Sequence, residues 1–289
     1  MILVTGGTGF VGREVVKELL NSGNKVRCIV RQRKSLPKHT NLDVVICDIT
    51  DKKSVDNAVK GCKIIIHLAA VIDSNDNDLW KVNVKGTANL VDSAQRLGVD
   101  KLVFVSTENV LPNKKDSYAA SKAAAEKIVE RFKKHTILRL TAVYGKGCRG
   151  NMARLFCTIS KRSFVPVLGR GNNRIQPIYI SDAVRYVLSS MHHGSGTYLV
   201  GGLDSVSMNE FIESIADAMG KKVFKVHLPL WLVYPLVKAY SLLIKAPRIS
   251  PIQIYYARID RTYDISRTIK FLKHRPLKLK DSLKLAIRG

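Results

Sequence analysis

Acidic residues are scarce in this chain. Among its 289 residues, 23 Asp and Glu stand against 48 Lys and Arg, which leaves a formal net charge of +25. Residues 221–289 hold 16 of the basic and only three of the acidic residues. An excess of this size indicates an anionic partner or surface, unless the whole proteome of the source is basic. No nucleic-acid-binding motif accompanies the charge, so we expect no specific nucleic-acid partner.

Cysteine is also sparse, with five residues and no C-x-x-C pair. An odd number without such pairs fits neither a disulfide framework nor a tetrahedral zinc site, so we expect no metal and a reducing compartment. Residues 2–5 already have the character of a strand, which leaves no room for a signal peptide. The cytoplasm is therefore the expected location.

A long hydrophobic run is absent. The longest apolar stretch, residues 228–244, is interrupted by Pro229, Pro235 and Lys238 and is shorter than the ~20 residues that span a bilayer. Glycine and proline are not abundant, and 46% of the residues are hydrophobic, which excludes a collagen-like or disordered protein. The composition is that of a globular chain.

The first 145 residues alternate short apolar runs with helical periodicity. This pattern predicts a doubly wound α/β fold with a parallel sheet, a Rossmann fold. The expected strands are residues 2–5, 25–30, 44–47, 64–68, 102–106 and 136–140, and the expected helices are 11–20, 54–60, 79–97 and 118–133. Residues 1–165 form the predicted nucleotide-binding domain, to which 178–200 return. Residues 166–289 form a smaller substrate lobe with a helix at 207–219, opened by the cap-like pair Ser207 and Glu210.

A glycine-rich turn, Thr5-Gly6-Gly7-Thr8-Gly9-Phe10-Val11-Gly12, joins the first strand to the first helix. Glycines at these positions permit a tight turn and a close approach of the backbone to a pyrophosphate at the helix N-terminus. The string fits two glycine spacings, one from Gly7 and one from Gly6, so spacing alone leaves the subfamily open. A dinucleotide is the predicted ligand.

The second strand runs into Arg31-Gln32-Arg33-Lys34, where NAD-binding units usually have an acidic residue. Cations suit a 2′-phosphate, so the sequence favours NADP over NAD, with Arg31 as the main contact. A solvated loop is the alternative. Asp48 follows the third strand, where it could accept from the adenine amino group or merely cap a helix.

Tyr118 and Lys122 lie four residues apart at the start of an Ala-rich helix, and this spacing puts them on one helix face. A nearby ammonium favours the phenolate and makes Tyr118 usable as a proton donor and acceptor near neutral pH. Ser106 and Thr107 end the preceding strand, at the sheet edge where ligands of open α/β sheets bind.

With these motifs, the chain resembles the extended short-chain dehydrogenase/reductase family over nearly its whole length. The branch it resembles most contains 3β-hydroxysteroid dehydrogenases and dihydroflavonol reductases. The matching segments are residues 5–12, His67-Leu68-Ala69-Ala70, Asn83 to Thr87, Phe104 to Thr107, Tyr118 to Lys122, Leu138 to Gly145 and Gln176 to Ala183.

The resemblance implies that Tyr118 is the general acid/base, that Lys122 holds the nicotinamide ribose and lowers the Tyr118 pKa, and that Thr107 hydrogen-bonds the substrate oxygen. His67 is interpreted as a core histidine. The expected cofactor contacts come from the glycine turn, the ends of the next strands and the catalytic helix. They are Gly6, Thr8, Gly9, Phe10, Val11, Gly12, Arg31, Asp48, Ile49, Leu68, Ala69, Ala70, Asn83, Tyr118, Lys122 and Val143.

Only ten residues separate Thr107 from Tyr118, where sugar-nucleotide epimerases and dehydratases of the family carry a longer loop. The short loop favours an NADP-dependent oxidoreductase acting on a hydrophobic, steroid-, terpenoid- or polyphenol-like substrate. An NAD-dependent epimerase or dehydratase and a non-catalytic subunit, similar to an accessory protein of respiratory complex I, remain as alternatives.

The apolar stretch 228–243 fits a lipid-like ligand, but it equally fits an ordinary packed helix. With its flanking lysines it also fits an anionic membrane surface. The partners that the sequence allows are thus a hydrophobic small molecule, an anionic membrane and a second copy of the chain.

Overall fold

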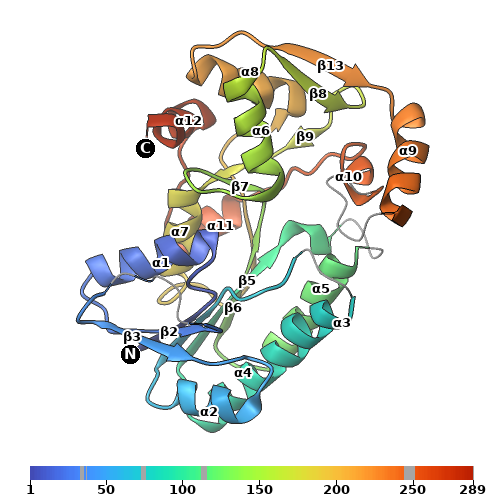
Figure 1. Ribbon diagram of the computed structural model, residues 1–289. Helices are drawn as coiled ribbons and strands as arrows, with labels where there is room; N and C mark the ends of the chain where they lie inside the picture. Colours follow the sequence, from blue (N-terminus) through green and yellow to red (C-terminus); the bar gives the residue numbers. More distant parts are fainter. Residues whose placement is uncertain (33–35, 37, 73–75, 112–115, 244–250, 289) are drawn as a thin grey trace. The chain divides into compact units, whose positions relative to one another are not determined.

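The computed structural model describes residues 1–32, 36, 38–72, 76–111, 116–243 and 251–288 (Figure 1). The chain divides into two compact units. Unit 1 comprises Met1–Leu140, Ile180–Val200 and Ile265–His274, and unit 2 comprises Thr141–Tyr179, Gly201–Asp264 and Arg275–Gly289. Residues 141–165, expected in the first domain, group with unit 2, because α6 (Gly150–Lys161) packs on α8 (Met208–Ala218) and β8 (Phe164–Leu168).

Unit 1 is built on a seven-stranded sheet whose described pairings are all parallel. The strand order is β11-β6-β5-β4-β1-β2-β3, which reverses direction between β4 and β1 and confirms the predicted doubly wound fold. The strands are β1 (Ile2–Thr5), β2 (Val26–Val30), β3 (Leu42–Ile46), β4 (Ile64–His67), β5 (Lys101–Thr107), β6 (His135–Leu140) and β11 (Gly196–Val200).

Helices cover both faces of this sheet (Figure 1). Alternate strand residues, such as Leu3, Ile65 and Phe104, pack with helices α2, α4 and α5, and α1 lies beside α7 over the other face. This double cover explains why β1 is buried along its whole length. The helices are α1 (Phe10–Asn21), α2 (Lys52–Val59), α3 (Asp76–Leu79), α4 (Thr87–Arg96), α5 (Ser117–Val129), α7 (Ile180–Ser189) and α11 (Ser266–Leu272).

The predicted helix at 79–97 contains an irregularity. Residues Trp80–Gly86 form a π-helical segment that runs directly into α4. Its wide turn contains the buried Asn83, and π-helical segments of this kind occur frequently at functional sites.

Unit 2 packs its own core around Tyr144. The Tyr144 hydroxyl lies 2.6 Å from Ser282 Oγ, and its ring meets Phe211 edge-on with centroids 6.0 Å apart. The predicted capping box of Ser207 and Glu210 opens α8. The remaining elements are β7 (Val143–Tyr144), β9 (Arg174–Ile175), β10 (Ile178–Tyr179), β12 (Val206–Ser207), β13 (Phe224–Leu228), α9 (Leu230–Leu243), α10 (Pro251–Tyr256) and α12 (Leu279–Arg288).

Candidate active site

The glycine turn after β1 is shaped by close backbone contacts. Gly6 has a φ of +72°, and a Cβ on it would lie 2.7 Å from the Ala69 nitrogen. A Cβ on Gly12 would lie 2.1 Å from the Gly6 carbonyl oxygen. Only glycine fits these two positions, because the turn passes against both the loop after β4 and the first turn of α1.

The N-terminus of α1 suits an anion. Its N-cap, Gly9, contributes no side-chain cap, and its first turn contains no acidic residue. The first N–H groups of a helix have no partner within the helix and concentrate positive potential there. Thr8, Phe10 and Val11 are half-buried around this end. The turn therefore fits the pyrophosphate of a dinucleotide.

Arg31 and Asp48 follow the carboxyl ends of the neighbouring strands β2 and β3. The residues just before them are hydrogen-bonded, since the Cys47 nitrogen donates to the Val30 carbonyl over 2.9 Å. Arg31 and Asp48 are both exposed. Asp48 Oδ1 already accepts a hydrogen bond from the Thr50 nitrogen over 2.8 Å. Residues 33–35 lie outside the described residues, so the expected help of Arg33 and Lys34 to Arg31 has no structural account.

Ile49 is buried, and its side chain packs against the Gly86 backbone, where a Cβ would meet it at 2.7 Å. The Ile49 carbonyl accepts from Asn89 Nδ2 over 3.0 Å. A cofactor could therefore meet Ile49 through its backbone N–H, while the side chain belongs to the core.

A chain of hydrogen bonds surrounds His67 at the end of β4. Thr5 Oγ1 lies 2.7 Å from His67 Nδ1 and accepts from the Ala69 nitrogen, while His67 Nε2 lies 3.0 Å from Thr87 Oγ1. Thr87 Oγ1 donates its single proton to the Asn83 carbonyl, so His67 Nε2 must carry a proton and Nδ1 must accept from Thr5. His67 is thus a neutral core histidine that positions its neighbours.

Electrostatics agree with this tautomer. Burial, together with the charge of Lys122, lowers the pKa of His67 to about 3. A neutral imidazole carries a single N–H, and because that proton is on Nε2, Nδ1 accepts from the Thr5 hydroxyl.

Asn83 joins the loop after β4 to α5. Its side chain exchanges two hydrogen bonds with the Val71 backbone, at 2.8 and 2.9 Å, and donates to Ser121 Oγ over 3.0 Å. Ser121 Oγ in turn donates to the Tyr118 carbonyl over 2.7 Å. These bonds hold the first turn of α5, and with it Tyr118, against the segment that follows Leu68, Ala69 and Ala70.

Tyr118 lies in the first turn of α5, whose N-cap residue Asp116 accepts from the Tyr118 nitrogen over 3.0 Å. One turn later, Lys122 is only 2% exposed. Its Nζ donates to the Val105 carbonyl over 2.8 Å and lies 3.9 Å from the centre of the Phe104 ring. The ammonium is thus held against the end of β5.

Burial lowers the pKa of Lys122 to about 7, although the Glu126 carboxylate acts in the opposite direction. Glu126 is four residues along α5, itself buried, and accepts from Arg139 Nε over 3.1 Å. The spacing of Lys122 and Glu126 was readable from the sequence as two residues on one helix face. Sequence reasoning assigned no role to Glu126, Arg139, Thr87 or Ser121.

Thr107 ends β5, and its Oγ1 accepts from the Asn109 nitrogen over 3.3 Å, which leaves its proton available for donation. The neighbouring Ser106 Oγ is buried and has no hydrogen-bond partner among the described residues. The structure therefore places Thr107 on β5 and Tyr118 and Lys122 on α5, and these two elements pack on each other. Val143 lies in β7 of unit 2. The roles expected of the individual site residues stay predictions.

A parallel sheet of this order, a glycine turn opening the first helix and a Tyr-Lys pair beside the end of β5 define a nucleotide-binding enzyme of the Rossmann type. The model of the NAD dependent epimerase/dehydratase family matches residues 2–201. The chain belongs to this family and is an NAD(P)-dependent oxidoreductase of the extended short-chain dehydrogenase/reductase type, as the sequence predicted.

The relatives include several activities. The chain is 26% identical to a 3-beta-hydroxysteroid dehydrogenase of Mycolicibacterium neoaurum, over 96% of this chain and 87% of the relative. It is 30% identical to a UDP-glucose 4-epimerase of Vibrio cholerae, over 80% and 79%. Among solved structures, MoeE5 in complex with UDP-glucuronic acid and NAD aligns with a TM-score of 0.79 and 23% identity, over 99% of this chain and 97% of that one.

Proposed function

We propose that the protein transfers a hydride between NADP and a carbonyl or hydroxyl carbon of a hydrophobic, steroid-, terpenoid- or polyphenol-like substrate. The observation that carries this proposal is the buried Lys122, one helical turn from Tyr118, whose Nζ is held by the Val105 carbonyl near the end of β5. An ammonium in this position favours the tyrosinate and brings the proton transfer of Tyr118 toward neutral pH.

Tyr118, Thr107 and Lys122 have separate roles in this reaction. In the oxidation direction, the substrate hydroxyl gives its proton to the Tyr118 phenolate while Thr107 donates a hydrogen bond to the same oxygen. A bound nicotinamide supplies the acceptor for the hydride that leaves the carbinol carbon. Reduction runs through the same groups in reverse, with Tyr118 protonating the carbonyl oxygen. In both directions the Lys122 ammonium stabilises the phenolate form of Tyr118.

Arg31 supports NADP. It is exposed at the carboxyl end of β2, where an NAD-binding unit usually has an acidic residue, and a guanidinium pairs well with a 2′-phosphate. The NAD in the MoeE5 complex favours the other nicotinamide cofactor. The choice between the two therefore rests on Arg31, which makes this residue the place to test it.

The hydrophobic substrate class is supported by the steroid dehydrogenase relative, which covers 96% of the chain. The second candidate function is an NAD-dependent sugar-nucleotide epimerase, favoured by the identity of 30% to the UDP-glucose 4-epimerase. The cytoplasm is the proposed location, because an odd number of cysteines without a C-x-x-C pair suits a reducing compartment.

Cofactor titration separates the candidates. NADPH and NADH are titrated into the wild type, Arg31→Ala and the control Lys25→Ala, which removes an exposed cation just before β2. We expect NADPH to bind at least tenfold more tightly than NADH to the wild type and the control, and equally to Arg31→Ala. Equal wild-type affinities, or tightly held NAD that co-purifies, would favour the epimerase.

A further inference from the structure

We infer that unit 2 docks on an anionic lipid bilayer through a surface formed by β8, β13 and the outward side of α9. This lipid-facing surface consists of Phe164, Pro166, Phe224, Val226, Trp231, Leu232, Tyr234 and Leu236. The inference goes beyond the proposed reaction, and neither cofactor nor substrate enters its test.

The two strands expose their apolar side chains as one group. β13 pairs in parallel with β8, so that Phe224 is the register partner of Phe164, and Val226 that of Pro166. All four are exposed, and Phe224 reaches 77%. Partners in register point to the same side of a sheet, so these residues share a face. The intervening Val165 and Val167 are buried in the core of unit 2.

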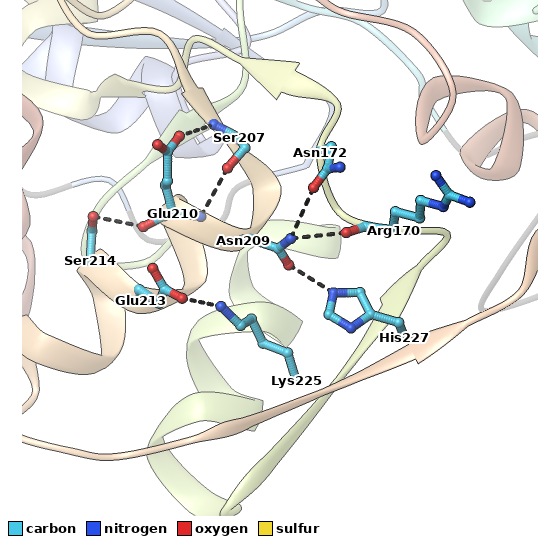
Figure 2. A network of polar contacts seen from close by, with 9 residues as sticks. All are labelled: Arg170, Asn172, Ser207, Asn209, Glu210, Glu213, Ser214, Lys225 and His227. Carbon is cyan, nitrogen blue, oxygen red and sulfur yellow. Dashed lines mark hydrogen bonds and ion pairs between the residues drawn. The ribbon is translucent and has the colours of Figure 1, made fainter.

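The polar side chains of β13 point the other way. Figure 2 shows Lys225 and His227 directed toward α8, where Lys225 pairs with Glu213 and His227 Nε2 donates to Asn209 Oδ1 over 3.0 Å. Asn209 also donates to the Arg170 carbonyl over 2.9 Å, which ties the turn after β8 to the same helix. The strand thus turns Lys225 and the exposed His227 toward polar partners on α8, while its large apolar residues Phe224 and Val226 face away from that helix without a polar role. A water-facing strand shows the opposite order.

Helix α9 continues the surface. It begins two residues after β13 ends, and a buried Val237 marks its inward side. The helix exposes Trp231 at 79% and Leu236 at 64%, and Leu232 and Tyr234 are exposed as well. A helix that is apolar on both sides and still exposed is typical of an interaction surface. Among the described residues, no helix is long and apolar enough to cross a membrane, so α9 would lie in the plane of the interface.

The charge around this surface selects the partner. The described residues within 218–259 include five Lys and Arg and no acidic residue. Lys221 and Lys222 are exposed directly before β13, and the Arg162 guanidinium lies 5.7 Å from the Phe164 ring. Aliphatic side chains such as Leu232 and Leu236 gain from hydrocarbon and nothing from nucleic-acid bases. Exposed apolar residues with cations beside them fit a bilayer that contains anionic lipid head groups.

The chain offers its own reporter, since Trp80 and Trp231 are its only tryptophans. Trp80 is in unit 1, so Trp80→Phe leaves Trp231 as the sole fluorophore. We expect Trp231 emission to shift to the blue and to be quenched by brominated lipids when vesicles of phosphatidylcholine with 30% phosphatidylglycerol are added. Pure phosphatidylcholine should bind at least tenfold more weakly, and raising the salt should release the protein from the mixed vesicles.

Matched variants test the surface by co-sedimentation. Lys221→Ser with Lys222→Ser should weaken binding to the anionic vesicles about 25-fold, because each lysine near the surface is worth about fivefold. Lys133→Ser with Lys134→Ser, an exposed lysine pair in unit 1, should leave binding unchanged. Trp231→Ala with Leu236→Ser should abolish it, and Trp80→Ala should not. The proposal is overturned by equal binding to both vesicles, by equal loss in the 133/134 variant, or by a Trp231 shift on adding RNA or a second copy of the chain but not on adding vesicles.

Discussion

The Thr5 hydroxyl lies 2.7 Å from His67 Nδ1 and joins the carboxyl ends of β1 and β4. These two strands flank the point where the order of the sheet reverses, which is where doubly wound folds bind their ligands. Through His67 Nε2 and Thr87 Oγ1 the same chain reaches Asn83. The buried His67 side chain, which has no predicted contact with substrate, thus links the strand ends beneath the predicted cofactor site to Asn83, which bonds to the helix of Tyr118.

His67 should make the fold sensitive to acid. Its pKa is about 3 in the folded chain and near 6.5 in the unfolded chain, so between these values the unfolded state binds the extra proton. The free energy of unfolding therefore falls as the pH drops from 6.5 toward 3. We expect His67→Asn to flatten this slope by about 1 kcal/mol per pH unit, measured by urea unfolding between pH 6.5 and 4.5. His192→Asn, which removes an exposed histidine, should keep the wild-type slope.

Gly6 should tolerate no side chain, because an added Cβ would collide with the backbone after β4. Gly23 serves as the control, because its backbone has nearly the same φ but an added Cβ has free space. The two glycines have φ values of +72° and +73°, but a Cβ on Gly23 meets nothing within 4 Å. We expect Gly23→Ala to lower the free energy of unfolding by about 1 kcal/mol and to leave dinucleotide binding intact. Gly6→Ala should cost roughly 3 kcal/mol or more and abolish binding, because its Cβ would push against the Ala69 nitrogen. Similar losses in both variants would contradict the close contact.

Much of this site could be predicted from the sequence. The glycine turn, the Tyr118–Lys122 spacing and Thr107 are carried by residues close in the chain, and local spacing determines which helix face or strand end they share. The doubly wound fold class of unit 1 follows from the alternation of strands and helices.

The contacts that position the site could not be predicted in the same way. Asn83 reaches Ser121 across 38 residues, and Thr5 reaches His67 across 62, so no periodicity reports them. The π-helical turn at Trp80–Gly86 looks like ordinary helix in the sequence, because one widened turn hardly alters the spacing of apolar residues. The boundary near residue 140 depends on α6 packing with α8, about 50 residues further along the chain.

Lys122 should reduce stability while serving catalysis. Its pKa is about 7 when folded and 10.5 when unfolded, so the unfolded chain binds more protons between these values and wild-type stability rises with pH there. Lys122→Met removes the buried ammonium but leaves the Val105 carbonyl without its donor, an opposing cost. We expect a net gain of roughly 2 kcal/mol at pH 6 and a smaller one at pH 9, measured by denaturant unfolding. Lys127→Met replaces an exposed lysine on the same helix and keeps Lys122. The difference in stability between this variant and the wild type should therefore not change with pH.

Turnover should depend on the hydroxyls of Tyr118 and Thr107 and on the ammonium of Lys122. A screen of hydrophobic ketones and alcohols with NADPH or NADP supplies the substrate, and kcat and cofactor affinity are then measured for variants of the three site residues. Tyr118→Phe removes the proton donor but keeps the ring and the hydrogen bond of its backbone to Asp116. It should lower kcat by roughly 10²–10⁴-fold with cofactor affinity nearly unchanged. Lys122→Met should damage both quantities. Thr107→Ser should retain most activity and Thr107→Val should lose it, because only the hydroxyl is needed to hold the substrate oxygen.

Wild-type turnover by Tyr118→Phe would refute the mechanism. NADPH binding without any substrate, and wild-type behaviour of all these variants in cells, would instead indicate a non-catalytic subunit in which the Tyr118–Lys122 pair persists without chemical use.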